Sequence, residues 1–200
     1  MHLVMNKNTY LKNRDEIQYA LSLKWDTKEK KYLETNNEVY ITVIEDHEIR
    51  IINFLKEVLK TWLKIYKESD GRVSSYEDTI NNTLSIIEAL KTNDTIFLYS
   101  KEIIKKKGNK IENIFGISIS EEIDKYNIKL LSNITYPYSQ LSRSKRPNNT
   151  IGAAGSNLRN YMVSYHFNTP YTKYIYSTTI NEKAEKGLLS IGFVKNNLIY

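Results

Sequence analysis

A small-residue stretch, Asn149–Leu158, has the residue types best suited to ligand chemistry. It reads NTIGAAGSNL and lies between a strand pattern and the start of an amphipathic helix pattern. Gly152 can adopt a positive φ, and Ala153 and Ala154 leave room for a ligand beside the backbone. The unpaired N–H groups of a first helical turn bind phosphate well. The stretch therefore predicts a phosphate site, although the same residues also suit close packing at a helix start.

Several chemistries are excluded by residues that the chain lacks. It has no cysteine, which excludes disulfide scaffolds, zinc–thiolate sites, iron–sulfur clusters and thiol nucleophiles. His2, His47 and His166 lie far apart in the sequence, so we expect surface or structural histidines and no histidine-based metal centre. The nucleotide fingerprints G-x-x-x-x-G-K-[ST] and G-x-G-x-x-G do not occur in the required context. A phosphate site would therefore be of another kind.

The composition indicates one ordinary domain. A chain of 200 residues and 23.5 kDa predicts a single domain, residues 1–200. Hydrophobic residues make up 40%, mean hydropathy is -0.51, and no apolar run approaches the length of a membrane helix, so we expect a soluble, cytoplasmic protein without a membrane partner. The net charge of +6 favours a polyanionic partner, and either a nucleic acid or a phosphate-bearing cofactor fits that charge.

The elements that must position the stretch follow from hydrophobic periodicity. A short amphipathic segment, Asp15–Leu23, predicts an N-terminal helical region of about 1–38. The longest helix is expected to begin at an Asp46 N-cap and to end at Asp70-Gly71. Further helices are expected at 75–90, 152–166 and 181–190, and strands at 39–44, 95–100, 111–120, 128–136, 173–179 and 193–200.

This order of elements predicts a mixed α/β fold with a mostly antiparallel sheet flanked by helices. Lys105–Asn109 supplies hairpin turn chemistry between the second and third strands, and Glu121–Asp124 is expected to form an acidic turn before the fourth. The helix at 152–166 then connects two strands as a crossover. The small-residue stretch is thus expected at the start of the crossover helix.

Motifs around the stretch resemble those of the GNAT superfamily of acyl-CoA N-acyltransferases. The pyrophosphate loop of that family reads Gln/Arg-x-x-Gly-x-Gly/Ala, and Asn149, Gly152 and Ala154 stand at those positions. Thr135-Tyr136-Pro137 is similar to the family's apolar-x-Pro before that loop. The downstream Asn-x-x-Ala and Gly-Phe signatures appear as Asn181, Ala184, Gly192 and Phe193. The similarity covers about Ile128–Phe193.

The resemblance implies a splayed, acyl-CoA N-acyltransferase-like sheet that holds acetyl-CoA or another acyl-CoA in a V-shaped gap. The implied reaction moves the acyl group, an acetyl group in the first instance, to an amine of an unidentified small molecule or protein. The backbone of one strand would pair with the pantetheine arm, and amides of the small-residue stretch would hold the pyrophosphate. The cofactor-binding residues so implied are Ile134, Thr135, Tyr136, Asn149, Gly152, Ala153, Ala154, Gly155, Ser156 and Asn181.

The chain also departs from the family pattern. The position of the family's tyrosine, the general acid toward the leaving thiolate, falls on Leu188, and Gly187 replaces the preceding leucine. Tyr176 and Ser177, on opposite faces of the strand 173–179, are the remaining candidates for a proton donor. The strand 128–136 has no carboxylate that could act as a base. Glu112, Glu121 and Glu122 are the alternatives nearby in sequence.

The connection Tyr138–Asn148 is longer than the family's turn. It contains Arg143, Lys145 and Arg146, which would bind a coenzyme phosphate or an acidic substrate, or simply belong to an exposed loop. The acceptor pocket is implied to lie between this connection and the helices of Asp46–Leu90.

Three other functions fit parts of the pattern. The absence of the tyrosine and of the strand carboxylate favours a non-catalytic module that only binds a ligand. Leu141-Ser142-Arg143 is similar to the Ser-Arg element of acyl-homoserine-lactone synthases, which share the implied fold. Tyrosines mixed with Lys and Arg between Tyr161 and Tyr176 suit nucleic-acid binding, without any module signature. The sequence leaves the oligomeric state open, a homodimer included.

Overall fold

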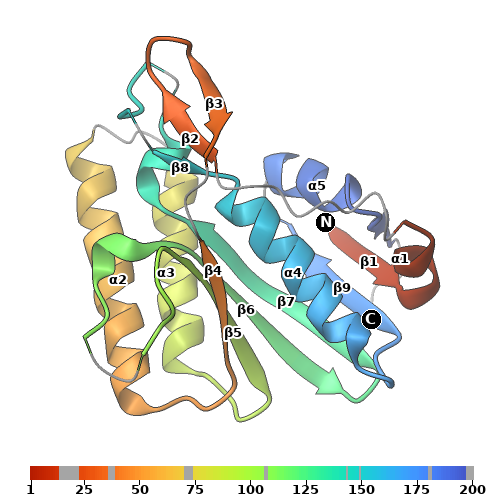
Figure 1. Ribbon diagram of the computed structural model, residues 1–200. Coiled ribbons are helices and arrows are strands. Elements are labelled where there is room, and N and C mark those ends of the chain that lie inside the picture. The colour runs from red at the N-terminus through yellow and green to blue at the C-terminus, as the bar shows by residue number, and fades with distance from the viewer. Residues whose placement is uncertain are drawn as a thin grey trace.

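A seven-stranded mixed sheet, mostly antiparallel, forms the centre of the fold (Figure 1). The computed structural model describes residues 1–13, 23–35, 39–69, 74–105, 108–142, 144–148, 150–179 and 182–196. In spatial order the strands are β10 (Val194–Lys195), β1 (His2–Asn6), β9 (Tyr174–Thr178), β7 (Asn127–Thr135), β6 (Ile114–Asp124), β5 (Asp94–Ser100) and β4 (Tyr40–Ile44). Only the neighbours β7 and β9 are parallel.

Helices cover both faces of this sheet. On one face, α2 (Ile49–Glu68) and α3 (Ser74–Glu88) pack against the apolar side chains of β5, β6 and β7. On the other, α4 (Ala154–Asn168) is joined by α1 (Lys7–Asn13) and α5 (Glu182–Leu189). Two apolar cores therefore lie on either side of the sheet, and the fold is a mixed α/β layer structure of the predicted class.

The expected order of the central elements is confirmed. β5, β6 and β7 form an antiparallel meander, and α4 connects the parallel pair β7 and β9 as a crossover. The acidic turn expected at Glu121–Asp124 is wrong, because β6 continues to Asp124 and pairs with β7 there. The turn lies at Lys125–Tyr126, where the Asp124 carboxylate accepts the N–H of Tyr126. A short 3-10 turn, Ile111–Asn113, precedes β6.

The start of α2 lies later than predicted. Asp46 was the expected N-cap, but the first helical carbonyl is that of Glu48, which accepts the N–H groups of Ile51 and Ile52. The apolar stripe behaves as predicted, since side chains such as Leu55 and Trp62 are fully buried.

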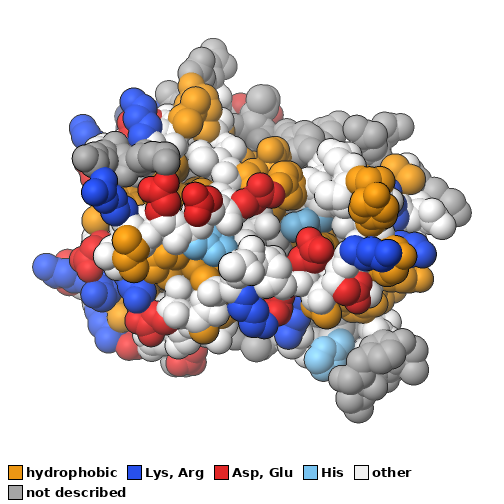
Figure 2. Space-filling model, turned by 90° about the horizontal axis from the view of Figure 1, so that it is seen from below, with side chains coloured by type: hydrophobic (Ala, Val, Ile, Leu, Met, Phe, Trp, Pro, Cys, Tyr) orange, Lys and Arg blue, Asp and Glu red, His pale blue; other side chains and the backbone are white. Residues whose placement is uncertain are grey.

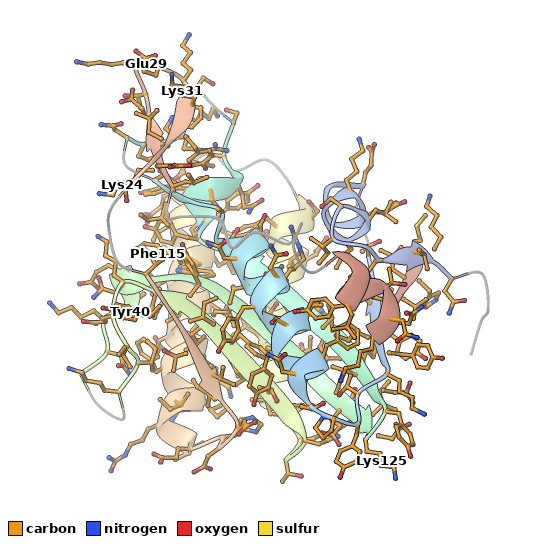
Figure 3. The ribbon with its side chains drawn as sticks, turned by 45° about the vertical axis from the view of Figure 1, so that its right-hand side comes forward. Lys24, Glu29, Lys31, Tyr40, Phe115 and Lys125 are labelled. Carbon is orange, nitrogen blue, oxygen red and sulfur yellow. The ribbon has the colours of Figure 1, made fainter. Side chains whose placement is uncertain are left out.

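The expectation of a helical region over 1–38 is wrong. This region holds β1, α1, β2 (Leu23–Asp26) and β3 (Lys31–Glu34), and the helix expected at 15–23 falls almost entirely outside the described residues. β2 and β3 form a hairpin whose turn is closed by the Asp26 carboxylate, which accepts two backbone N–H groups. β2 also pairs with β8 (Ile151–Gly152), and the hairpin projects from the body of the protein, as the labels Lys24, Glu29 and Lys31 show in Figure 3.

The described side chains at one end of the molecule form no patch of a single charge sign. Figure 2 shows that end, which lies at the bottom of Figure 1, with acidic and basic side chains intermixed. Among the described residues, none of the helices combines the length and apolar character needed to cross a membrane.

His166 is a buried structural residue. It lies on α4, its Nε2 is 2.7 Å from Ser120 Oγ on β6, and its ring contacts Phe97. Burial lowers the pKa of this imidazole to about 4, from an ordinary 6.5. Between these values the unfolded chain binds more protons than the folded protein, so stability is lost as pH falls.

As the pH falls from roughly 6.5 to 4, we expect the protonation of His166 in the unfolded chain to lower the free energy of unfolding by about 1.4 kcal/mol per pH unit. Urea unfolding at several pH values measures the slope. A His166→Gln variant should show a shallower slope, and His2→Gln, which changes an exposed histidine, should keep it. Equal slopes in all three proteins would contradict the assignment.

Candidate functional site

A gap opens where β7 and β9 part. The two strands pair only between Asn127–Leu130 and Tyr174–Ser177, although β7 continues to Thr135 along β6. A register shift between β6 and β7 lies at this point. Tyr136 donates its N–H to Phe115 on the β6 side, so by strand alternation the backbone groups of Thr135 face the gap. β7 therefore has a partly open inner edge.

The N-terminus of α4 lies against this inner edge. The Asn133 amide donates to the Gly155 carbonyl at 3.0 Å and accepts from Ser118 Oγ at 2.9 Å, tying the first turn of α4 to the sheet. Glycines permit the close approach: a Cβ at Gly155 would lie 3.1 Å from Thr135 Cγ2, and one at Gly116 would lie 2.6 Å from Leu158 Cδ1. The helix start is thus fixed by tight packing and one bridging amide.

The predicted positive φ at Gly152 is wrong. The left-handed residue is Ala153, with φ 59°, which is the N-cap of α4. Gly152 is required for a different reason, because a Cβ there would lie 2.5 Å from the ring of Tyr32. The first turn of α4 contains no acidic residue and its N-cap side chain makes no capping hydrogen bond. The first N–H groups of α4 thus lack a side-chain cap, and groups of this kind favour an anion.

A cavity of about 370 Å³ lies at the α4 N-terminus, within the size range of small-molecule sites. Its walls are formed by the end of β7 and the following turn, by α3, by the β2–β3 hairpin and by α4 with α5. The lining residues are Tyr32, Tyr66, Ser75, Tyr76, Thr79, Asn133, Ile134, Thr135, Ser139, Gln140, Arg146, Gly152, Ala153, Ala154, Gly155, Ser156, Arg159 and Ala184. This set contains two arginines and no carboxylate.

Arg159 is the cation nearest the helix start. Its Nε is buried without a hydrogen-bond partner, and Nη2 has only a long contact of 3.5 Å with Ser156 Oγ. None of the described carboxylates forms an ion pair with it. Burial lowers the pKa of this guanidinium, which nevertheless stays charged. The side chain is half-buried, and a partly desolvated cation without a counter-charge is stabilised when a ligand supplies the anion.

Gly187 and Leu188 have clear structural roles. A Cβ at Gly187 would lie 2.7 Å from Arg159 Nη2, so the missing side chain makes room for the guanidinium. Leu188 is buried in the core beneath α5. Leu188 therefore faces the core and offers no polar group to the cavity.

The cavity contains most of the predicted cofactor residues. Ile134, Thr135 and all of 152–156 line it, whereas Tyr136 does not. Asn149 and Asn181 lie outside the described residues, as does Arg143 of the predicted cationic loop. Of the other two cations in that loop, Arg146 lines the cavity, and Lys145 is exposed and does not line it.

The residues predicted to move protons lie away from the cavity. Tyr176 is on the paired part of β9 and donates to Asn127 Oδ1 at 3.2 Å. Ser177 is buried next to it and opposite Leu130. Neither of these lines the cavity, nor do Glu112, Glu121 and Glu122.

Tyr76 is one of several polar lining side chains that the sequence did not assign to the site, and it makes a hydrogen bond to β7. It lies on α3 and its hydroxyl donates to the Thr135 carbonyl at 2.7 Å, across the open end of β7. Burial, followed by the neighbouring Tyr66 and Tyr136, raises the pKa of this phenol, so it stays protonated. The helical periodicity of 75–90 assigned the Tyr76 ring to the apolar core. Periodicity does not show which group the hydroxyl at the end of that ring contacts.

No protein-family model matches this chain, and no characterised protein matches it in sequence. The fold class and the geometry of the cavity are therefore the basis for assigning a function.

A charge placed in the first turn of α4 tests the anion site. Ser156 is exposed and lies three residues after the N-cap, so Ser156→Asp should stabilise the helix by about 0.3–1 kcal/mol. The same carboxylate would pair with Arg159 and repel an incoming phosphate. We expect a raised melting temperature together with at least tenfold weaker binding of coenzyme A in calorimetry.

Ser156→Asn is the matched control, because the asparagine side chain has nearly the same shape as that of aspartate and carries no charge. It should keep the affinity for coenzyme A within about twofold. Unchanged affinity in Ser156→Asp would exclude the helix start as the phosphate site.

Proposed function

We propose that this protein is an acyl-CoA-dependent N-acyltransferase, with acetyl-CoA as the first donor to test. The observation that carries the proposal is the half-buried Arg159 guanidinium, whose Nε has no partner, beside the first-turn amides of Ala154–Ser156, at the point where β7 and β9 part. The resemblance of the residues in this region to GNAT motifs adds to it. A phosphate-bearing cofactor would supply the anion that the described residues lack.

The residues present fit such a cofactor. The first-turn amides of α4 and Arg159 would hold its diphosphate, since a helix N-terminus and a guanidinium both favour anionic oxygens. The inner edge of β7 at Asn133 and Thr135 offers backbone groups to an extended arm. When bound, an acyl-CoA supplies an activated thioester for transfer to an amine.

Proton transfer limits what this cavity can do. The single proton of Tyr76 is committed to the Thr135 carbonyl, so Tyr76 acts first as a positioning group for the end of β7. None of the described lining residues is a carboxylate or a histidine, so none of them has the basicity to deprotonate an ammonium. The amine must enter the cavity neutral or lose its proton to solvent.

The same observation favours one second function, a module that binds acyl-CoA without turnover. Both functions need the anion site, and they differ in thiol release. Acetyl-CoA binding is measured by calorimetry, and free thiol is measured with a mixed panel of amines. Binding together with amine-dependent thiol release supports the transferase. Binding alone supports the module, and no binding contradicts both.

Arg159→Gln should weaken acetyl-CoA binding at least tenfold, because it removes the cation and keeps a polar, uncharged side chain. Gly187→Ala should act in the same direction by displacing the guanidinium, while gaining helix propensity of up to about 1 kcal/mol in α5. Lys60→Gln, on the exposed side of α2, serves as the control for general charge loss. Equal losses in all three variants would contradict a specific role for Arg159.

Tyr76→Phe and Tyr176→Phe form a matched pair, since each removes one hydroxyl from a tyrosine. Tyr76→Phe leaves the Thr135 carbonyl without its donor at the cavity, so we expect kcat/KM to fall at least tenfold. Tyr176→Phe should keep full activity, because that hydroxyl lies at Asn127. Full activity in Tyr76→Phe together with a loss of activity in Tyr176→Phe would instead favour Tyr176 as the proton donor.

A further inference from the structure

A second guanidinium, that of Arg146, reaches the cavity from a different wall. Its Nη2 donates to the carbonyls of Ser139, at 3.1 Å, and Leu141, at 2.9 Å. The guanidinium carbon lies 4.8 Å from the ring centre of Trp25 and 5.2 Å from that of Tyr32, both on the β2–β3 hairpin. The group is thus held in place by two carbonyls and two aromatic rings.

These contacts fix the cation without neutralising it. Both hydrogens of Nη2 are used by backbone carbonyls, and Nε is buried without a partner, so Nη1 is the part left for a ligand. None of the described carboxylates forms an ion pair with Arg146. Ordering a long side chain in this way costs entropy, and the protein gains a preorganised positive charge at the cavity wall.

The two cations together restrict the ligands that the cavity accepts. A diphosphate at the α4 N-terminus would pair with Arg159. Arg146 lies on a different wall of the cavity, so this diphosphate would leave it without an anion. Because the lining has no carboxylate, a ligand with several ammonium groups would meet two like charges and no partner. A ligand set with a second anionic group satisfies both guanidinium ions.

We propose that Arg146 is a subsite for an anionic group of the acyl acceptor, so that the acceptor is an amine that also carries a carboxylate or a phosphate. This inference rests on the proposed transferase function. The two aromatic rings, with centres 5.2 Å apart, both contact the guanidinium from the hairpin side. They place this subsite under the hairpin and make the hairpin the element that selects the acceptor. A polyamine is the acceptor class that this charge arrangement disfavours.

The test uses L-amino acids, each beside its carboxamide, as probes that differ only in the anionic group. With the protein saturated with coenzyme A, calorimetry should show binding of at least one amino acid about tenfold or more tighter than its carboxamide. Arg146→Gln should abolish this preference and keep the affinity for coenzyme A within about twofold. Lys145→Gln, in the same loop but outside the cavity lining, should behave as the unmodified protein.

Other outcomes overturn the inference. A loss of coenzyme A affinity in Arg146→Gln that disappears when coenzyme A lacking its 3′-phosphate is used would assign Arg146 to the cofactor. No preference for carboxylates in the coenzyme-bound protein, or a preference for 1,4-diaminobutane over 4-aminobutyrate, would also overturn it and leave the cofactor site standing.

If coenzyme A does not bind, the proposed function fails by itself. The amino acids are then titrated against the free protein, where binding that needs Arg146 supports the subsite and no binding overturns it.

Discussion

The hydrogen bond from the Asn133 amide to the Gly155 carbonyl fixes the position on which the candidate site depends. It joins the start of α4 to β7 exactly where β7 has lost its neighbour β9, and Gly116 and Gly155 let the helix approach the sheet closely. Together with the packing of Ala154 and Leu158, this attachment sets the direction of the first-turn amides. The backbone of β7 and of the α4 N-terminus therefore forms the frame of the cavity. The side chains of its two arginines add positive charge to that frame.

The frame is electrically one-sided. It offers oriented N–H groups and two guanidinium ions to a ligand, and among the described lining residues nothing that can accept a proton strongly. Such a site binds anions well and leaves the protonation state of an incoming amine to the solution. A transferase built in this way works best on amines that are already neutral near its working pH.

The sequence predicted the middle of the fold well and the site in part. The antiparallel meander and the α4 crossover follow from apolar periodicity and turn residues, which act locally. The β2–β3 hairpin was missed because the pattern near Trp25 also fits a helix, and strands of four residues carry little periodic signal. The small residues of 152–156 line the cavity, and the left-handed position is Ala153 and not Gly152. Arg159 and Tyr76 were missed because helix periodicity gives a face and not the reach of a long side chain.

The place of β1 in the sheet has a consequence for how the chain reaches this structure. β1 is the first strand in the sequence, yet it lies between β9 and β10, where His2 pairs with Thr178 and Leu3 with Lys195. During synthesis this strand must wait, unpaired, until β9 has left the ribosome. Contacts of such sequence separation carry a high loop-closure entropy and form slowly, so the sheet closes on this side in a late step. The edges of β1 and β9 stay unpaired until then, which makes the nascent chain prone to aggregation at that stage.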